Sequence, residues 1–546
     1  MDAIRSVLFP SATAIVVVFA VAALMLQTRW IRGRLVRRAV LWAPWIIGVA
    51  LVLRFRWWTF LVQREFNLDE AQFLAGAVKI LKGYPVPWTD IDMGTVGYLV
   101  PLSLTPSTAI APAAPYVGAR LLIVLCAVAW TIGVALLLHR AVGWPAAQAL
   151  ASPLLALLAM PANLEAFAYS AEMPAIALVV LGFGVAWAWA DRAQGLVIGG
   201  VLLGLVPFAK LQAAPVALVA ALAVYTGLLA TRRLTRRRAV MFAAGGLAPA
   251  AIVAVVLLLV PSVRTAFFGN AQFLRDYSTG DAVFARQGVS ETLPVYLDGV
   301  LRPALVFLAV LAAASIAVVI HRGGAFARDR AILFASVAVG AVGVVAMLTP
   351  GHTFPHYVWI GVVPVFLAVA ALSGVVVSAF DGRTAMVLIC LALLGSIVVF
   401  SRGGNVIGGI GTVSKTRTLL PAGWPVTRLT DLRDGTLGDV HAAVAGCRGP
   451  VGVWGWNPNA IVAADVAYAT PWAVITRPLD PSATRWFGLM LANPPDCLMD
   501  TARKGDFYFG PNDALNRMPD GAKLLEQYDT VLDTPEYRVY RLKGAE

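Results

Sequence analysis

The chain has 546 residues, of which 59% are hydrophobic and only 13% are charged, and its mean hydropathy is +0.77. Soluble domains carry about 25% charged residues, so this composition excludes a soluble protein and indicates an integral membrane protein. The formal net charge of +13 does not indicate a nucleic-acid partner, because the arginines cluster in short connections between apolar runs, which is the pattern that sets membrane topology.

Apolar runs of about 20 residues, the length that crosses a bilayer as a helix, recur through roughly the first 400 positions. We predict a polytopic, all-α membrane domain with about 12 transmembrane helices. The first is expected to be retained, because no small-residue cleavage site marks a signal peptide. The helices are expected at 8–27, 39–61, 117–138, 145–160, 173–190, 194–208, 213–230, 240–260, 298–320, 331–348, 357–379 and 384–400.

The connections between these runs differ in composition on the two sides of the membrane. If the helices alternate, the arginine-rich connections 29–38, 231–239 and 321–330 fall on one side, which we assign to the cytoplasm. The opposite side receives the segments that carry acids, a lysine and histidines, so the active face and both chain termini are predicted to be extracytoplasmic. These segments are 62–116, 161–174, 208–215, 261–297, 349–357 and the tail.

The tail differs in composition from the membrane domain. We divide the chain into a membrane domain, 1–401, and a small extracytoplasmic α/β domain, 402–546. In the tail, GPVGVWGWNPNAIVAAD predicts a strand, a turn and a helix, PPDCLMDTA a second strand, and LLEQYDTVLDTPEYRVYRL two strands around a turn. Cys447 and Cys497 both lie in the tail, where an oxidising compartment would permit a disulfide between them. The chain contains no CxxC or HExxH pattern, which argues against a structural zinc site.

Two pairs of acids follow the second predicted helix, in the stretch REFNLDEAQFLAGAVKILKGYPVPWTDID. Asp69 and Glu70 fit the first turn of a helix that Asn67 or Asp69 caps and Gly83 ends. Lys79 and Lys82 are expected on the polar side of this helix, which could lie in the membrane interface. The same geometry places a carboxylate where it can act as a general base. Asp90 and Asp92 fit local backbone caps in a turn.

This stretch resembles the first external loop of the GT-C glycosyltransferases of the protein O-mannosyltransferase-like group, to which the aminoarabinose transferases belong. That loop has roughly an Asp-Glu pair, a helix, a Leu-x-Gly-x-x-Pro-Tyr segment and a further acid, and the helix here ends in Gly-Tyr-Pro. This chain has MGTVGYLVPL where the family commonly has Pro-Pro-Leu. PGHTFPHYVWIGVVPVFL, AYSAEMPAIAL and GLVPFAKLQAAPVAL resemble later segments of the family in the same order. The resemblance covers roughly residues 40–400 and implies a sugar on a polyprenyl phosphate as the donor.

The resemblance implies that Asp69 is the catalytic acid–base residue, with Glu70 orienting it or binding the acceptor. Cationic and polar residues are expected to bind the donor phosphate: Lys210, Arg264, Arg275, His352, His356 and Tyr357. Residues expected around the acceptor or the cavity are Asp90, Asp92, Glu165, Glu172 and Gln212. Simpler interpretations stay open, since Lys210 fits a lysine snorkelling from a helix end, Tyr357 an aromatic-belt residue and Glu172 a helix-start acid.

We therefore predict a multi-pass glycosyltransferase of a bacterial cytoplasmic membrane that transfers a sugar to a lipid, polysaccharide or protein acceptor. No metal or cofactor is expected, although Asp69, Glu70 and Asp92 could hold a divalent cation. The alternatives are a glycan polymerase or ligase acting on lipid-linked oligosaccharides, and a transporter or flippase. The acids lie at loop entrances and the helix centres are apolar, which favours an enzyme over a transporter.

Overall fold

The computed structural model divides into two compact units, each made of three segments. The helical unit comprises Met1–Trp57, Leu122–Ala254 and Arg286–Trp424, and the mixed unit comprises Trp58–Leu121, Val255–Ala285 and Pro425–Glu546. The first predicted external segment thus groups with the C-terminal domain. The structure describes residues 11–29, 33–91, 97–157, 167–279, 289–296, 302–350, 354–406, 432–433, 435–471, 481–502 and 513–544.

Helices occupy the described parts of the predicted apolar runs. Within the described ranges, six helices are long and apolar enough to cross a membrane: Pro115–Leu155, Leu211–Ala230, Arg236–Leu259, Ala304–Arg322, Ala331–Leu348 and Val358–Val377. The chain is therefore a multi-pass membrane protein by its helices, and the total of about 12 spans stays a prediction. The helices are α2 Ser11–Arg29, α3 Arg34–Leu61, α6 Pro115–Ala151, α7 Pro153–Leu157, α8 Glu172–Ala188, α9 Ala193–Leu205, α10 Ala214–Ala230, α11 Arg236–Leu259, α13 Val289–Tyr296, α14 Arg302–Arg322, α15 Gly324–Asp329, α16 Ala331–Leu348, α17 Val358–Val377 and α18 Gly382–Val406.

The two helices expected at 117–138 and 145–160 form one run, α6, that is broken at Gly143. This residue has φ 77° and ψ 163°, a conformation that is not helical and that glycine adopts without steric cost. The break lies between the two predicted helices, as expected, but the non-helical gap is shorter than predicted. The helix resumes directly after Gly143 with Trp144 and Pro145. Pro145 is compatible with the start of a helix, where no backbone N–H is needed.

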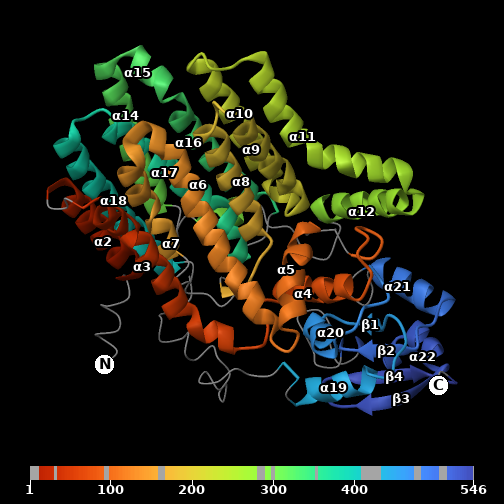
Figure 1. Cartoon of the computed structure of the whole chain (residues 1–546). Helices are drawn as coiled ribbons and strands as arrows, with labels where there is room; N and C mark the ends of the chain where they lie inside the picture. Colours follow the sequence, from red (N-terminus) through yellow and green to blue (C-terminus); the bar gives the residue numbers. More distant parts are fainter. Residues whose placement is uncertain are drawn as a thin grey trace, which may run out of the picture. The chain divides into compact units, whose positions relative to one another are not determined.

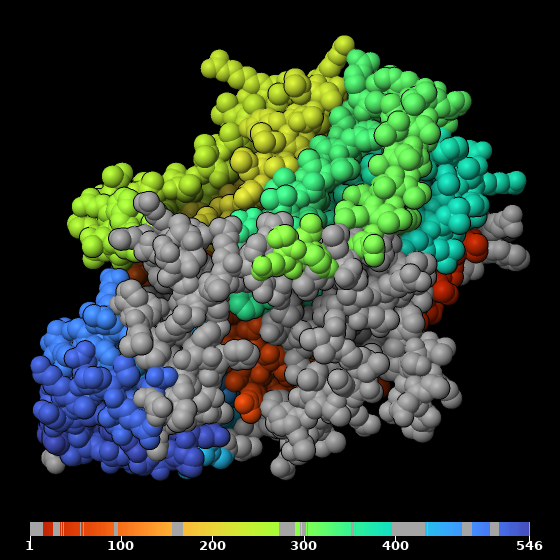
Figure 2. All heavy atoms as spheres, turned by 180° about the vertical axis from the view of Figure 1, so that it is seen from behind, coloured from red at the N-terminus to blue at the C-terminus, as the bar shows by residue number. Residues whose placement is uncertain are grey.

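Helix α17 forms the centre of the helical unit. All of its residues are buried, and it packs against α16, α14, α8 and α18 (Figure 1). In contrast, α11 and α14 expose large apolar side chains such as Leu247, Ile252 and Ile320. Figure 2 shows part of this surface, in the yellow-green and green spheres of the two helices. Apolar side chains on the outside of a helical unit are expected where the surrounding solvent is lipid.

Glycines bring several helices of this unit into backbone contact. A Cβ added at Gly184 of α8 would collide with the backbone of Gly133 of α6. In the same way, a Cβ at Gly204 of α9 would collide with the backbone of Gly246 of α11. In membranes, where lipid is as apolar as the side chains, such close approach through small residues is a main source of helix association.

The mixed unit contains the strands that were predicted in the tail. Its sheet has the order β1-β2-β4-β3, with β1 and β2 parallel and the other neighbours antiparallel (Figure 1). The strands and helices follow the expected order of strand, turn, helix, strand and hairpin. The elements are α4 Leu68–Leu81, α5 Leu99–Ile110, α12 Pro261–Thr279, α19 Thr436–Val444, β1 Gly452–Trp454, α20 Pro458–Ala464, α21 Pro481–Ala492, β2 Cys497–Asp500, α22 Pro519–Leu525, β3 Tyr528–Asp533 and β4 Arg538–Leu542.

Aromatic packing and a disulfide hold the α/β domain together. Trp454 of β1 contacts Trp486 and Phe487 of α21, with ring centroids 5.2 and 4.8 Å apart. Cys447, which follows α19, is bonded to Cys497 at the start of β2, with Cα atoms 5.9 Å apart. The sequence analysis allowed this pairing without deciding it, and the structure shows it.

Candidate functional site

Four of the predicted site residues, drawn from three separate segments, meet in the helical unit. Glu172 begins α8, Lys210 lies between two short 3₁₀ turns, and His356 and Tyr357 end a third such turn before α17. The Lys210 ammonium lies 2.9 Å from Glu172 Oε1 and 5.3 Å from the centre of the Tyr357 ring. The imidazole of His356 packs edge-on against Tyr357, with centroids 4.8 Å apart. We call these four residues the Glu172 cluster.

The local sequence explains why a lysine points into this buried place. Pro207 interrupts the run between α9 and α10, and Lys210 adopts an extended conformation (φ −154°, ψ 113°) between two 3₁₀ turns. Two residues later, the side-chain amide of Gln212 donates to the carbonyl oxygen of Ala346 at 2.6 Å. Gln212, predicted to line the cavity, thus ties this irregular segment to α16 close to the cluster.

The Glu172 cluster is buried and chemically suited to an anion. The side chains of Lys210 and Glu172 are only 8% and 1% exposed, so their charges interact in a medium of low polarity. Nearby in the sequence, Ser170 Oγ and Trp359 Nε1 are buried and make no hydrogen bond within the described parts of the chain. Buried donors without a partner are costly unless a ligand or water satisfies them. The buried lysine beside an imidazole and a phenol makes this cluster a candidate for phosphate binding.

The acid pair of the first predicted external segment lies in the mixed unit, and its two members differ. Asp69 lies in the first turn of α4, half-buried, and its backbone N–H donates to the side chain of Asn67 at 2.8 Å, so Asn67 is the helix cap. Glu70 is completely buried and forms an ion pair with Arg120 of α6 at 3.4 Å. Asp69 is thus the more accessible carboxylate of the pair.

Arg120 is a residue whose role sequence reasoning missed. Its guanidinium donates to the carbonyl oxygens of Thr59, Val62 and Arg64 at the end of α3, as well as to Glu70. It thereby connects the end of α3, the start of α4 and the start of α6. The available signal was a lone arginine in the apolar run GARLLIVLC, because a cation in such a run needs buried partners.

The mixed unit also buries a lysine that the sequence analysis assigned to the polar side of α4. Lys79 donates to the carbonyl oxygen of Thr470 at 2.7 Å and lies 4.1 Å from the centre of the Tyr468 ring. Burial lowers the pKa of Lys79 to about 7, and the negative charge of Asp90 offsets part of that effect. Lys79 joins α4 to the α/β domain, so its expected position on a polar face was wrong.

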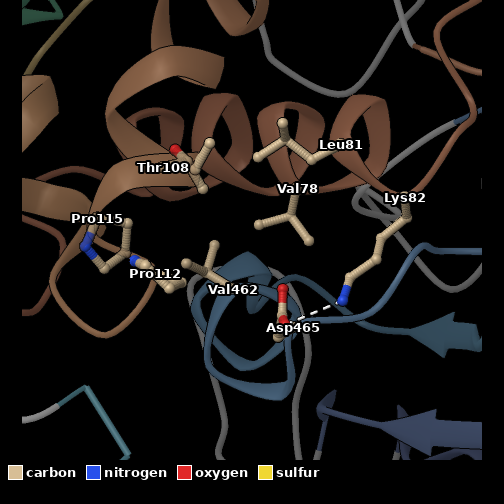
Figure 3. Close-up of a pocket in the computed structure, with 9 residues that line it drawn as sticks. Val78, Leu81, Lys82, Thr108, Pro112, Pro115, Val462 and Asp465 are labelled. Atoms are coloured by element: carbon tan, nitrogen blue, oxygen red, sulfur yellow. Dashed lines mark hydrogen bonds and ion pairs between the residues drawn. The ribbon is translucent and has the colours of Figure 1, made fainter.

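A small pocket lies between α4, α5 and α20 in the mixed unit (Figure 3). It has a volume of about 140 Å³, with apolar walls from α4, α5 and α20 such as Val78 and Val462. Lys82 and Asp465 close one end through an ion pair of 2.9 Å, and Asp465 has the left-handed conformation (φ 56°) that ends α20. We assign no ligand to this pocket.

Three further predicted site residues, Asp90, Arg264 and Arg275, lie in described parts of the mixed unit. Asp90 Oδ2 accepts from the backbone N–H of Val86 at 2.9 Å, which agrees with its interpretation as a turn cap. Arg264 is exposed on α12, and Arg275 lies on the same helix. Asp92, Glu165 and His352 lie outside the described residues. Asp92 is also one of the three expected cation ligands. Among the residues that the structure describes, no three His, Cys, Asp or Glu side chains gather as a metal site requires.

No family model and no curated protein matches the chain. The structure of ArnT from Cupriavidus metallidurans bound to undecaprenyl phosphate matches with a TM-score of 0.50 and 13% identity, and the match covers 92% of this chain and 99% of ArnT. The apo structure of the same protein matches with a TM-score of 0.49 and 14% identity, over 91% and 98% of the two chains.

The chain has a GT-C fold. The complex of ArnT, an aminoarabinose transferase of that fold, decides this because the likeness extends over nearly the whole of both chains. The resemblance that the sequence motifs indicated is thereby confirmed at the level of the fold. Fold likeness alone assigns no activity, which has to be argued from the residues.

Proposed function

We propose that this chain is a membrane glycosyltransferase that transfers a sugar from a polyprenyl-phosphate donor to an acceptor hydroxyl. The observation that supports the proposal most is the buried Glu172 cluster, in which a lysine, an imidazole and a phenol lie close together in a chain of the GT-C fold. The structural neighbour was determined with undecaprenyl phosphate bound, which supports a lipid phosphate as the anion that such a cluster serves.

In the proposed reaction, the acceptor hydroxyl oxygen forms a bond to the anomeric carbon of the sugar as the bond from that carbon to the phosphate oxygen breaks. The hydroxyl proton passes to Asp69, and the polyprenyl phosphate leaves with the bonding electrons. Asp69 suits the role of base because it is the accessible acid of its pair, whereas Glu70 is committed to Arg120. Glu70 then positions Asp69 through the start of α4 and is not itself a catalytic residue.

The departing phosphate gains negative charge, so cations and donors fixed in advance lower the barrier. Lys210 supplies the charge, and His356 and Tyr357 supply further hydrogen-bond donors in the same cluster. Glu172 holds the Lys210 ammonium in place before the donor arrives. Arg264 and Arg275 of α12 are kept as further candidates for donor binding from the mixed unit.

The orientation of the helical unit is proposed from the two ends of α8. Its 17 residues span about 25 Å, with the Glu172 cluster at the first end and Asp191, surrounded by arginines, just past the last. Arginine-rich connections face the cytoplasm, so the Glu172 cluster is expected on the external face. This supports the cytoplasmic membrane of a bacterium as the location, with a lipid, polysaccharide or protein acceptor outside.

The test is sugar transfer in membranes supplied with radiolabelled polyprenyl-phosphate sugars, comparing the wild type with Asp69→Asn. We expect the wild type to label an acceptor and Asp69→Asn to lose about 10²–10⁴-fold in rate, the usual contribution of a general base. Asp90→Asn is the matched control, since Asp90 lies in the same segment and accepts a hydrogen bond from backbone. It is expected to keep most of the activity.

Three outcomes would revise the proposal. Equal activity of Asp69→Asn and the wild type would leave Asp69 as a residue of the first turn only. Transfer from lipid-linked oligosaccharides alone would indicate a polymerase or ligase. Absence of transfer from every donor, combined with movement of labelled lipid between leaflets in vesicles, would replace the enzyme by a flippase.

A further inference from the structure

Three arginines from two different parts of the helical unit surround the carboxylate of Asp191. Arg140 of α6 binds Asp191 Oδ2 at 2.8 Å, Arg238 of α11 approaches Oδ1 at 3.5 Å, and Arg233, just before α11, approaches Oδ2 at 3.7 Å. Arg140 also donates to the carbonyl oxygen of Ala188, and Arg238 to that of Arg233. These contacts fix the arginines relative to one another, and we call the group the Asp191 cluster.

The Asp191 cluster has an excess of positive charge. One carboxylate faces three guanidinium groups, and Asp191 is the only acid in the sequence segments 139–151, 188–195 and 228–240. Partial burial alone would raise the pKa of Asp191, but the hydrogen bond from Arg140 and the charges of the three arginines hold it below its usual value. Asp191 is therefore ionised at neutral pH, and the cluster has a net charge of about +2.

The arginines have donors to spare. A guanidinium carries five N–H groups in a planar fork that matches the oxygens of a phosphate, and the contacts above use only some of them. The side chains of Arg233, Arg238 and Arg140 are 44%, 28% and 24% exposed, and that of Asp191 is 51% exposed. The cluster is thus a prearranged set of donors that solvent or a ligand can reach.

The surroundings of the cluster are typical of the level of lipid headgroups. Trp144 and Trp189, which are 46% and 42% exposed, lie close in sequence to Arg140 and Asp191, and exposed tryptophans mark the membrane interface. Leu229 near the end of α10 and Val240 in the first turns of α11 are 66% and 58% exposed. In Figure 1 the connection between these two spanning helices lies at one end of the helices of this unit.

We propose that the Asp191 cluster binds the headgroup of an anionic phospholipid, with its phosphate held by Arg233, Arg238 and Arg140. Charge excess selects an anion, and the exposed tryptophans and apolar side chains beside the cluster select one that is attached to a lipid. The site is separate from the Glu172 cluster at the other end of α8, and it does not depend on the proposed transferase activity.

The experiment is native mass spectrometry of the purified full chain in detergent, titrated with phosphatidylglycerol or phosphatidylcholine. We expect the wild type to bind phosphatidylglycerol more tightly. Arg233→Gln with Arg238→Gln is expected to weaken phosphatidylglycerol binding about 25-fold, since each arginine near an anionic headgroup contributes about fivefold. Arg140 is left in place because it ties α6 to the end of α8.

Arg328→Gln with Arg383→Gln is the control, because both arginines are exposed and the change of net charge is the same. We expect it to change the affinity for phosphatidylglycerol less than twofold. Equal weakening by this control, or equal affinity of the wild type for the two lipids, would overturn the proposal. If the double variant has a lower melting temperature than the wild type in phosphatidylcholine, the single variant Arg233→Gln is titrated instead. Its contact with Asp191 is the longest of the three, so its loss should disturb the fold least.

Discussion

Each unit contains a buried ion pair between an acid and a base, and the two pairs use different cations. In the mixed unit, Glu70 faces Arg120, whose guanidinium also donates to three backbone carbonyl groups at the end of α3. In the helical unit, Glu172 faces Lys210, which lies beside the ring of Tyr357. An arginine keeps its proton and saturates several acceptors at once, whereas a lysine is a compact charge that can exchange one anion for another. On this basis we propose a structural role for the first pair and, as part of the proposed donor site, a binding role for the second.

The largest effect is expected from removing Arg120. Arg120→Met leaves Glu70 and three carbonyl groups without their buried donor, so the free energy of unfolding should fall by about 3–5 kcal/mol. Thermal unfolding of the purified protein measures this. Glu70→Gln combined with Arg120→Met should regain part of the loss, because no buried charge is then left alone. A stable Arg120→Met variant that lacks only transferase activity would break the comparison.

Removing Lys210 is expected to lower the transfer rate strongly and the free energy of unfolding less than removing Arg120. Lys210→Met should lower the rate of sugar transfer about 10²–10³-fold, the usual cost of losing one group that stabilises developing negative charge. Its melting temperature should fall less than that of Arg120→Met, because Glu172 can take up a proton. Lys210→Arg keeps the charge and should recover part of the activity. Unchanged transfer by Lys210→Met, with an intact fold, would make this pair structural as well.

Lys79 offers an intermediate case, a buried lysine with structural contacts. Its pKa is about 7 in the folded chain and about 10.5 without burial, so between these values the unfolded chain binds more protons than the folded one. Stability should therefore rise with pH from about 7 to about 10.5, by at most about 1.4 kcal/mol per unit, and should not respond to Lys79 below that window. The melting temperature should rise with pH across this range more steeply for the wild type than for Lys79→Met. Equal slopes would show that Lys79 is not the group that titrates.

The smallest effect is expected at the cap of α4. Asn67→Ala removes the acceptor of the Asp69 backbone N–H and should cost about 1 kcal/mol of stability. Asn67→Asp restores an acceptor and should be close to the wild type. If Asp69 is the base, the alanine variant should also lower the transfer rate, because the start of α4 orients this carboxylate. Reduced stability with normal kinetics would separate the cap from the catalysis.

The sequence predicted what depends on local pattern. The apolar runs, the cap and end of α4, and the order of strands in the tail all follow from composition and spacing, and the structure confirms them. Lys210, His356 and Tyr357 were grouped as donor-phosphate residues only through resemblance, and Glu172 was expected around the acceptor or the cavity instead. The meeting of all four was not predicted, since nothing local brings residues of three loops together. Arg120 and Lys79 were missed or misplaced for the same reason. Their partners are carbonyl groups and rings far along the chain, which no local pattern encodes.

The covalent bond between Cys447 and Cys497 has a consequence for how the protein is made. It joins residues 50 positions apart in the tail, and a bond of this kind forms and persists in oxidising compartments. If the tail is extracytoplasmic, as predicted, formation of this bond in a living cell would show that the tail has crossed the membrane. Labelling with a bulky maleimide, with and without prior reduction, would reveal the bond as a shift on a gel. The state of this bond would thus report translocation of the tail without a reporter fusion.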